Sequence, residues 1–489
     1  MKINIDEPIL KKIGNVAEKY NIDVFVVGGY VRDSLLNKKR YDIDCTVVGD
    51  SIEFAKIVAK EFNTKVVIYE RFRTALVPIG KTNIEFVGTR KEEYLPDSRN
   101  PITKEGTLED DLRRRDFTIN AMAASIRNHS KDYRFGEVID LFNGVDHLEK
   151  KMLITPLDPV ITYMDDPLRM MRAARFASQL QFRIDPASIA AICSLAKRIK
   201  IVSKERLADE FLKIIASDKP SIGIHILYKT GLLKYVLPEL HATKGIEQAS
   251  DKDGQVFHHK DVYHHTLQVL DNAASVSNHF DTSAEVLRFR LAALFHDIAK
   301  PQTKKYIEGS GWHFFGHEER GAKMVEPIFR KMKLPLDNID YIKKLIRLHL
   351  RPTFLITEEI TDSAVRRLAA NAGEVLEDLF LLCKCDITSK NPNLTQKYLA
   401  KYDKVAQMVI DVQIKDKLRE FQSPVRGEEI MAICNIPPSK MVGYIKTNIE
   451  NAILDGIIPN DYDEAKTYFL THKNQWLQAD VTNFRISTR

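Results

Sequence analysis

The distribution of apolar residues changes once along the chain, and this change restricts the folds that the sequence can adopt. Up to about residue 140, short β-rich runs such as VFVV (24–27) and DIDCTVV (42–48) alternate with helical patterns such as 51–62. Beyond that point helical periodicity dominates to the C-terminus. The sequence therefore predicts an α/β head with a small mixed sheet, followed by an all-helical body and tail.

Length and composition set the frame for this prediction. The 489 residues suffice for about three domains, each with its own core. The balance of 73 Lys and Arg against 67 Asp and Glu leaves +6, which permits a polyanionic partner without requiring one. The expected division is a head at 1–140, a helical neck and body at 141–242, a second helical domain at 256–388 and a tail at 395–489.

The cysteines and the apolar runs indicate in which cellular compartment the protein is expected. The 5 cysteines form no CxxC pair, and their odd number fits a reducing compartment. The first residues carry acidic side chains and no continuous apolar core, so they do not resemble a signal peptide. No apolar run approaches the roughly 18 residues that a membrane span needs. We therefore expect a cytoplasmic protein with no membrane partner.

Two aspartates in the second β-rich run, Asp42 and Asp44, are separated by one residue. Because strand side chains alternate between faces, both carboxylates point to one side, while Ile43 and Cys45 point to the other. Two like charges this close need a positive partner, and Mg²⁺ prefers one or two carboxylates completed by water and phosphate oxygens. The pair predicts a Mg²⁺ site for a phosphate-bearing substrate.

A glycine pair and an arginine precede these aspartates within one strand-helix-strand unit. Gly28 and Gly29 let the backbone approach a bound group, and the N–H groups at the start of the next helix favour anions. Arg32 adds a planar cation that suits a phosphate. A DxD alone is most often an incidental feature of a solvated turn, but its combination with the glycines and the arginine favours a nucleotide site.

These residues resemble the signature of the nucleotidyltransferases that add CCA to tRNA, a class shared with bacterial poly(A) polymerases. The resemblance rests on GGYVRD with RYDIDCTVV and on four later motifs in the family's order. Those motifs are DDLRRRDFTINAMA (110–123), DLFNGVDHLEKKMLITP (140–156), DDPLRMMRAARFA (165–177) and KERLADEFLKII (204–215).

The resemblance implies that an RNA 3′-hydroxyl attacks the α-phosphate of a nucleoside triphosphate and releases pyrophosphate. It implies that Asp42 and Asp44 are catalytic and hold Mg²⁺, with Glu85 as the expected third carboxylate. The implied nucleotide-binding residues are Gly28, Gly29, Arg32, Arg115, Asp166, Arg169, Arg172 and Arg175.

A later helix offers a way to select a base without a template. Pro167 suits the first helical position, which makes Asp166 the N-cap, and Arg169, Arg172 and Arg175 follow at steps of three. Such steps drift by about 60° and rise about 4.5 Å, so the four charged residues form one winding stripe. Cytosine and adenine each present an amine donor beside a ring-nitrogen acceptor, which a carboxylate next to a guanidinium matches. The resemblance assigns this role to Asp166 and Arg169, with the other two arginines nearer sugar and phosphate; the alternative is a cap beside a solvated face.

Poly(A) addition is the main alternative function, because those enzymes share the head and a similar arginine helix. The stretch 93–111 is long, polar and hinge-like, and it resembles the flexible loop with which CCA-adding enzymes switch from CTP to ATP. Enzymes that add only CC are expected to lack this loop. The segment INAMAASI (119–126) also resembles the CCA type more closely. We therefore expect addition of C, C and A from CTP and ATP.

The helical half places histidines and acidic residues on successive predicted helices, in an order that resembles the H…HD…D pattern of HD phosphohydrolases. His317 and His349 are expected near a phosphate or a second ion. Such ligands suit Ni²⁺, Mn²⁺ or Zn²⁺, or Mg²⁺ through water, and the bound ion would activate water as a nucleophile. A purely structural metal site is the alternative. The expected metal ligands are His265, His296, Asp297 and Asp386.

The implied partner is the 3′ end of tRNA with its acceptor and T arms, read by shape and backbone contacts. Lysines and arginines of the neck and tail are expected to supply these contacts. Two other classes stay open: a phosphohydrolase whose head only senses nucleotides, and a tRNA-binding protein without catalysis. Neither the oligomeric state nor the substrate of the HD domain follows from the sequence.

Overall fold

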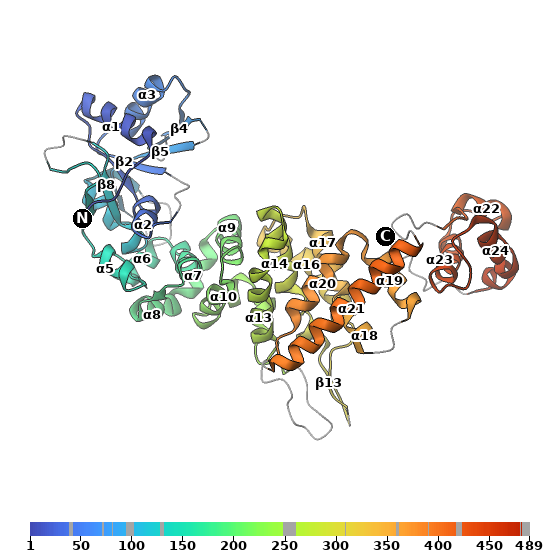
Figure 1. Cartoon of the computed structure of the whole chain (residues 1–489). Helices are drawn as coiled ribbons and strands as arrows, with labels where there is room; N and C mark the ends of the chain where they lie inside the picture. Colours follow the sequence, from blue (N-terminus) through green and yellow to red (C-terminus); the bar gives the residue numbers. More distant parts are fainter. Residues whose placement is uncertain are drawn as a thin grey trace. The chain divides into compact units, whose positions relative to one another are not determined.

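The computed structural model divides into two compact units, Met1–His241 and Ala242–Arg489 (Figure 1). The finer division expected from the sequence stays a prediction. The structure describes residues 1–38, 43–70, 73–80, 82–93, 102–127, 132–247, 261–308, 310–357, 361–389, 391–416, 423–479 and 481.

The first unit begins with the predicted α/β head, whose main sheet has seven strands in the order β3-β4-β5-β2-β1-β8-β9. All neighbouring strands are antiparallel except β2 and β5, which are parallel, so the predicted mixed sheet is confirmed. The elements of the head are α1 (Pro8–Tyr20), β1 (Val24–Val27), α2 (Gly29–Leu35), β2 (Ile43–Val47), α3 (Ser51–Glu61), β3 (Val67–Tyr69), β4 (Thr74–Ile79), β5 (Thr82–Gly88), β6 (Arg90–Glu93), β7 (Ile102–Glu105), α4 (Leu108–Arg113), β8 (Met122–Ser125) and β9 (Val138–Asp140).

The alternation of strand side chains divides the sheet between two cores. On β1, Val26 lies in the core that α1 and α3 supply, whereas Val27 faces a smaller core beneath α4. On β2, Ile43 and Cys45 join the first core, so Asp44 between them is exposed on the opposite face. The predicted alternation is thus confirmed for these three residues, while Asp42 lies outside the described residues.

The expected hinge-like loop at 93–111 is largely structured at its two ends. Strand β6 pairs antiparallel with β7, and α4 begins at Leu108 behind a capping box formed by Thr107 and Asp110. Residues 94–101 lie outside the described residues. The prediction missed β6 and β7 because their charged sequences, RKEE and ITKE, lack the apolar alternation that marks a half-buried strand.

The neck that follows is helical, as predicted, except for one parallel pair of two-residue strands. A strand of two residues is too short to show a hydrophobic period, so the sequence could not predict this pair of strands. Helix α7 packs against α9 and α10. The elements are α5 (Gly144–Glu149), β10 (Met152–Leu153), α6 (Pro159–Asp165), α7 (Leu168–Leu180), β11 (Arg183–Ile184), α8 (Pro186–Leu195), α9 (Lys204–Ile215), α10 (Pro220–Lys229), α11 (Leu233–Val236) and α12 (Pro238–His241).

Among its described residues the second unit is helical apart from one β-hairpin, which projects from the helices in Figure 1 and which the sequence did not predict. Helix α13 packs against α14 and α20, and α14 also packs against α17. Among the described helices none is long and apolar enough to cross a membrane. The elements are α13 (Val262–Ser275), α14 (Ser283–Phe295), α15 (Lys300–Thr303), β12 (Lys305–Ile307), β13 (Gly311–His313), α16 (His317–Met332), α17 (Ile339–Leu348), α18 (Arg351–Thr357), α19 (Asp362–Ala372), α20 (Leu376–Asp386), α21 (Pro392–Asp416), α22 (Gly427–Cys434), α23 (Lys440–Leu454) and α24 (Tyr462–Leu477).

Candidate functional site

Two carboxylates lie side by side on the central strands of the head sheet. Asp44 of β2 and Glu85 of β5 are direct partners in the parallel ladder, so their side chains stand on the same face. Partial burial raises the pKa of the Glu85 carboxyl, and the negative charge of Asp44 raises it further, against the opposing effect of Arg90. A divalent cation would relieve this repulsion, and the all-oxygen ligands suit Mg²⁺.

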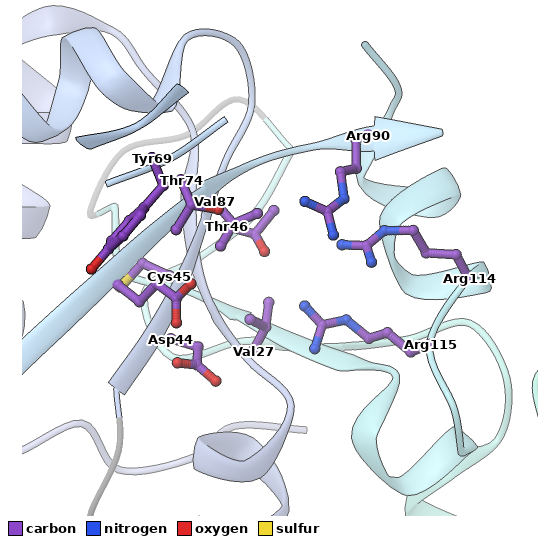
Figure 2. Close-up of a pocket in the computed structure, with 11 residues that line it drawn as sticks. Val27, Asp44, Cys45, Thr46, Tyr69, Thr74, Val87, Arg90, Arg114 and Arg115 are labelled. Carbon is purple, nitrogen blue, oxygen red and sulfur yellow. The ribbon is translucent and has the colours of Figure 1, made fainter. Parts of the chain in front are cut away.

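A cavity of about 380 Å³ opens on this face of the sheet. Asp44 and Glu85 are among the residues that line it. Figure 2 shows three guanidinium groups that reach into the cavity from the side opposite Asp44. These belong to Arg90, Arg114 and Arg115. Carboxylates facing guanidinium groups across such a space suit a ligand that carries phosphates together with a cation.

The buried carboxylate of Asp111 fixes two of these arginines. Asp111 accepts hydrogen bonds from Arg114 and, at 3.1 Å, from Nη2 of Arg115, and its side chain is fully buried. Burial alone would raise the pKa of Asp111, but the two guanidinium groups outweigh it and lower the pKa. Sequence reasoning named Arg115 but missed Arg90, Arg114 and Asp111. The run DDLRRR (110–115) was an available signal for Asp111 and Arg114, but not for Arg90.

Gly28 has a structural reason of its own to be glycine. Its φ of +65° is in the left-handed region, and a Cβ atom there would lie 2.9 Å from Nη1 of Arg115. A side chain at this position would therefore displace a guanidinium of the cavity. Gly29 is the first residue of α2, and the expected contacts of both glycines with nucleotide stay predictions.

Arg32 belongs to a hydrogen-bonded chain that links α2 to α7. Its Nη1 donates to Oδ1 of Asn120 at 2.7 Å, Nδ2 of Asn120 donates to Oδ1 of Asp116 at 3.1 Å, and Nε of Arg172 donates to Oδ2 of Asp116 at 2.6 Å. Burial by itself raises the pKa of Asp116, but Arg172 and Asn120 outweigh it and lower the pKa to about 2. Asp116 therefore stays ionised and holds Arg172 in place.

The charged residues of α7 lie close to the positions that the sequence indicates, but they are less solvated than a surface stripe. Helix α7 begins at Leu168, one residue later than expected, and Oδ1 of Asp166 still accepts the Leu168 N–H at 3.1 Å. Arg169 is buried, and its Nη2 donates to the Arg114 carbonyl at 2.6 Å. Its Nη1 donates to the Thr162 carbonyl at 3.5 Å, so two backbone groups fix the plane of this guanidinium.

The other two arginines of α7 share one acid on α9. Arg175 is buried and its Nη1 lies 3.1 Å from Oε1 of Glu210, while Nη1 of Arg172 lies 3.8 Å from the same oxygen. The guanidinium of Arg175 also lies over the ring of Phe176 at 4.3 Å. Sequence reasoning missed Glu210, which lies within the KERLADEFLKII motif but carries no local sign of its partners.

A second cluster lies in the second unit, where helix ends bring six side chains together. The ligand atoms of His265, His296 and Asp386 form one group, and those of Asp297, His317 and His349 form another. The structure therefore brings together all four predicted ligands and both histidines that were expected beside them. The clustering of these six residues is confirmed, while their roles stay predictions.

Asp297 faces both groups. Its Oδ2 lies 3.2 Å from Nε2 of His296 and 3.6 Å from Nε2 of His265. Its Oδ1 lies 3.3 Å from Nε2 of His317 and 3.8 Å from Nε2 of His349. One carboxylate thus stands between two sets of imidazole nitrogens.

Backbone carbonyls orient three of the four histidines. Nδ1 of His296, His317 and His349 donates to the carbonyls of Ala293, Phe314 and Ile346, at 2.8, 2.7 and 2.6 Å. A carbonyl only accepts, so Nδ1 carries a proton, and the neutral form of each of these imidazoles presents the lone pair of Nε2 to the cluster. Nδ1 of His265 instead lies 3.0 Å from the hydroxyl of Thr388. This is the outer support that metal-binding imidazoles need.

The cluster attracts positive charge. The Nε2 atoms of His296 and His317 are buried and make no hydrogen bond to any described residue. Burial alone would lower the pKa of His296, but the carboxylates of Asp297 and Asp386 outweigh it and raise the pKa to about 10. Burial and the nearby His296 lower the pKa of His349 to about 3. Nitrogen and carboxylate ligands in this number fit a divalent transition metal.

Three family models match successive parts of the chain. The poly A polymerase head domain matches residues 24–154, the probable RNA and SrmB-binding site of polymerase A matches 181–244, and the HD domain matches 262–382. Together they cover the α/β head with its cavity, much of the neck, and the histidine cluster.

Curated relatives match over most of the chain. A multifunctional CCA protein of Ralstonia nicotianae is 32% identical over 68% of this chain and 72% of its own length. A CC-adding tRNA nucleotidyltransferase of Thermus thermophilus is 27% identical over 92% of this chain and 93% of its own. An A-adding tRNA nucleotidyltransferase of Deinococcus radiodurans is 29% identical over 69% and 73%.

Solved structures share the fold. The Bacillus stearothermophilus CCA-adding enzyme in complex with CTP has a TM-score of 0.63 at 20% identity, covering 96% of this chain and 98% of that one. The Thermotoga maritima CCA-adding enzyme complexed with tRNA has a TM-score of 0.59 at 19% identity, covering 95% and 96%.

The fold and the two sites define a nucleotidyltransferase that carries an HD domain. The chain belongs to the family of CCA-adding enzymes and bacterial poly(A) polymerases, among the homologues of the multifunctional CCA proteins.

Proposed function

We propose that this protein adds C, C and A to the 3′ end of tRNA from CTP and ATP. The observation that carries the proposal is the head cavity, where Asp44 and Glu85 face the guanidinium groups. The ribose 3′-oxygen attacks the α-phosphorus, the bond from that phosphorus to the oxygen of the β-phosphate breaks, and pyrophosphate leaves while the hydroxyl proton passes to solvent. Mg²⁺ held by Asp42, Asp44 and Glu85 would neutralise charge on the phosphates.

The arginines of the cavity bind the triphosphate in this proposal. Arg115 and Arg114 are anchored by a fully buried carboxylate, so their guanidinium groups are already oriented before the nucleotide binds. Arg32, which does not line the cavity, is oriented by the side-chain oxygen of Asn120. Fixed cations lower the entropy cost of aligning the α-phosphorus with the attacking hydroxyl. The backbone at Gly28 and Gly29 approaches the same phosphates.

Base selection is assigned to Asp166 and Arg169. Two carbonyls hold the plane of the Arg169 guanidinium, and Asp166 is held by the first turn of α7. A fixed acceptor beside a fixed donor matches the edge that cytosine and adenine share and opposes that of guanine and uracil. Arg172 and Arg175, which share Glu210, are placed nearer the sugar and phosphates.

The proposal also states which nucleotides are added: C, C and A rather than CC alone or A alone. The multifunctional CCA protein shares 32% identity, and the motif INAMAASI also favours CCA. The CC-adding relative aligns over 92% of the chain and the A-adding relative over 69%. Within the loop expected at 93–111 to separate these activities, residues 94–101 lie outside the described residues. Poly(A) addition is the alternative that the shared head leaves open.

A primer extension assay tests the proposal. tRNA transcripts that end at the discriminator base, in C or in CC are incubated with Mg²⁺ and with CTP, ATP or both, and products are resolved to one nucleotide. We expect C, C and one A, then a stop, with no product from Asp44→Ala and normal product from Asp209→Ala, an exposed aspartate of α9. A ladder of A without CTP would make the protein a poly(A) polymerase, and a stop after CC or a need for a CC end would assign it partial addition.

We propose a second activity for the HD domain, the hydrolysis of a phosphate ester. The observation that favours it is the position of Asp297 between two groups of imidazoles, which suits two divalent ions on either side of one carboxylate. A water oxygen adds to phosphorus, one ester P–O bond breaks, and the departing oxygen takes a proton from the water. Ions such as Mn²⁺, Ni²⁺ or Zn²⁺, or Mg²⁺ through water, would supply Lewis acidity.

Metal analysis and hydrolysis of bis(p-nitrophenyl) phosphate test this second activity in the full-length protein. We expect bound transition metal and metal-dependent hydrolysis, both lost in Asp297→Ala and both kept in Asp340→Ala, a highly exposed aspartate of α17. Tightly bound metal without hydrolysis of this diester, of p-nitrophenyl phosphate or of 2′,3′-cyclic nucleotides would leave a structural metal site.

We propose the acceptor and T arms of tRNA as the macromolecular partner, with contacts to the neck and the tail. The basic excess of the chain permits a polyanionic partner, and binding through phosphate contacts is expected to weaken as salt rises. A cytoplasmic location is proposed with it, and the 5 cysteines, all of them free, fit a reducing compartment.

A further inference from the structure

The β-hairpin of the second unit carries exposed aromatic side chains that have no role in either of the two proposed activities. Strands β12 and β13 pair in antiparallel register, with Tyr306 opposite Trp312 and Lys305 opposite His313. Tyr306 is 61% exposed and Phe315, just beyond the hairpin, is 72% exposed. In Figure 1 this hairpin projects from the helices of its unit.

The rings form two pairs with lysines beside them, and because strand side chains alternate, Trp312 and His313 point to opposite faces of the hairpin. His313 and Phe315 lie parallel, with centroids 4.9 Å apart and an interplanar angle of 11°. Tyr306 meets Trp312 edge to face at 5.1 Å, and Nζ of Lys304 lies 3.9 Å above the Trp312 ring. Because Phe315 is mostly exposed, the stack that it begins with His313 is open to a further planar group.

The end of the hairpin segment contacts residues of the histidine cluster. It lies in the chain between Asp297 and His317, and the carbonyl of Phe314 accepts the Nδ1 proton of His317 at 2.7 Å. Lys300 connects the two regions a second time, since its Nζ lies 2.6 Å from Oδ2 of Asp297 and 5.5 Å from the centre of the Phe314 ring. A phosphate held at the cluster would therefore place its attached group near Phe314, at one end of this aromatic segment.

We infer that the aromatic hairpin, residues 304–308 and 310–315, stacks on the nucleobase of the HD-domain substrate, which is a nucleotide phosphate ester. The inference rests on the proposed hydrolase activity of the same cluster. Open aromatic faces bind bases regardless of sequence, and the adjacent lysines Lys300, Lys304 and Lys305 complement the negative charge of the phosphate. The two sources of this chemistry are a free nucleotide and a phosphorylated 3′ end of an RNA.

A protein partner is less favoured as the occupant. The aromatic rings are interleaved with lysines, and the ladder has only three residues in each strand. A protein interface needs a larger and more continuous apolar area than such a small hairpin offers. The mixture of rings and positive charge fits a base with its phosphate.

The chain contains a built-in probe for the test. It has 2 tryptophans, Trp312 in the hairpin and Trp476 in α24, so Trp476→Phe leaves one fluorophore in the hairpin. Full-length Zn²⁺-loaded protein with this change is titrated with 3′-CMP, with inorganic phosphate and with a five-nucleotide RNA ending in a 3′-phosphate. The same titrations are run with Phe315→Ala, and with Tyr20→Ala as the matched control, since Tyr20 is an exposed tyrosine beside a lysine in the head.

We expect 3′-CMP to quench Trp312 and to bind at least tenfold more tightly than inorganic phosphate. Loss of a stacking ring weakens base binding by about five- to hundredfold, so Phe315→Ala should bring 3′-CMP close to phosphate, while Tyr20→Ala should change nothing. If the RNA binds more tightly than 3′-CMP, the source is an RNA end, and equal affinities indicate a free nucleotide.

The readouts separate the inference from the activity on which it rests. Quenching by 3′-CMP that depends on Phe315, without hydrolysis of bis(p-nitrophenyl) phosphate, supports a nucleotide-binding hairpin and overturns the hydrolase proposal alone. Hydrolysis combined with equal binding of 3′-CMP and phosphate overturns the hairpin inference alone. A Trp312 signal that changes only with protein concentration would identify a second copy of the chain as the occupant and also overturn the inference.

Discussion

The head cavity and the histidine cluster both suit divalent ions and phosphates, but the protein builds them differently. In the head, Asp44 is exposed on an open sheet face and its ladder partner Glu85 is half-buried. In the second unit, His296, Asp297 and His349 are almost fully buried. The first arrangement leaves ligand positions for water and substrate phosphates, as Mg²⁺ requires, whereas the second offers a nearly complete set of protein ligands.

The support behind each site differs in the same way. Strand register sets the spacing of the head carboxylates, and a buried acid fixes two of the arginines opposite them. Backbone carbonyls fix three of the imidazoles in the cluster. Where the substrate supplies ligands to the metal, as proposed in the head, the protein fixes cations around the carboxylates. Where side chains supply most of the ligands, as in the histidine cluster, the protein fixes the ligands themselves.

Separate loss of the two activities is the strongest test of this comparison. Asp44→Ala should lower nucleotide addition at least about a thousandfold, because it removes a metal carboxylate, and should leave the metal content of the HD domain unchanged. Asp297→Ala should do the reverse. The measurements are primer extension and metal analysis on the same preparations. If either change removed both, the two sites would be coupled rather than independent.

Metal exchange sharpens the difference in ligand chemistry. After treatment with a chelator, Mg²⁺ should restore nucleotide addition, while hydrolysis in the HD domain should recover about a hundredfold further with Mn²⁺, Ni²⁺ or Zn²⁺ than with Mg²⁺. Both activities are assayed against each ion in turn. Equal recovery of hydrolysis with Mg²⁺ would contradict the assignment of the cluster to transition metals.

Asp116→Asn tests the support behind the head site. The pKa of Asp116 is lowered to about 2 from the usual value of about 3.9, so its ionised form contributes about 2 to 3 kcal/mol to the free energy of unfolding. Because the folded pKa is the lower one, this contribution is fully present above the unfolded pKa and is lost as the pH falls through the folded value. Urea unfolding followed by circular dichroism should show a constant gap to wild type from pH 7 to 5, about halved near pH 3.

The matched control for this change is Asp209→Asn on the exposed face of α9, which should cost less than about 0.5 kcal/mol. A gap for Asp116→Asn that stays constant down to pH 3 would mean that packing, rather than charge, accounts for the loss.

The smallest effect on metal affinity is expected at His265, the imidazole of the cluster whose Nδ1 contacts a side chain rather than a backbone carbonyl. Thr388→Val removes the hydroxyl beside Nδ1 of His265 and should lower metal affinity about tenfold. The other three imidazoles use carbonyls that no side-chain substitution removes. Competition with a chromogenic chelator measures the affinity, with Thr467→Val in α24 as the control. An unchanged affinity would show that the orientation of His265 is set by packing alone.

The sequence predicts those parts of the molecule in which interacting residues are close in the chain or belong to a motif. The alternation of Ile43, Asp44 and Cys45 follows from the period of a strand, and the six HD residues follow from a motif order. Sequence reasoning treated His317 and His349 as separate from the ligands, whereas the structure places Asp297 against them as well.

Other features depend on tertiary contacts that a single sequence does not show. Glu210 meets Arg175 across two helices, and Asn120 meets Arg32 across the head, with no local pattern to connect either pair. The hairpin was missed because three-residue strands carry too little periodicity within a helical region. Strand β7 lies within the loop expected at 93–111, and its charged sequence, like that of β6, lacks the apolar alternation of a half-buried strand.

The parallel pairing of β2 with β5 has a consequence for how the chain tolerates insertions and deletions. The register that sets Asp44 opposite Glu85 also sets buried Ile43 opposite buried Ile84. A one-residue deletion within β5 would turn Glu85 into the core and Phe86 toward the cavity, so folding and chemistry would fail together. A two-residue shift would restore the faces but move Glu85 by about 7 Å along the strand, which preserves a fold without a site. Length changes in this family are therefore expected to gather in the connections and to spare β5.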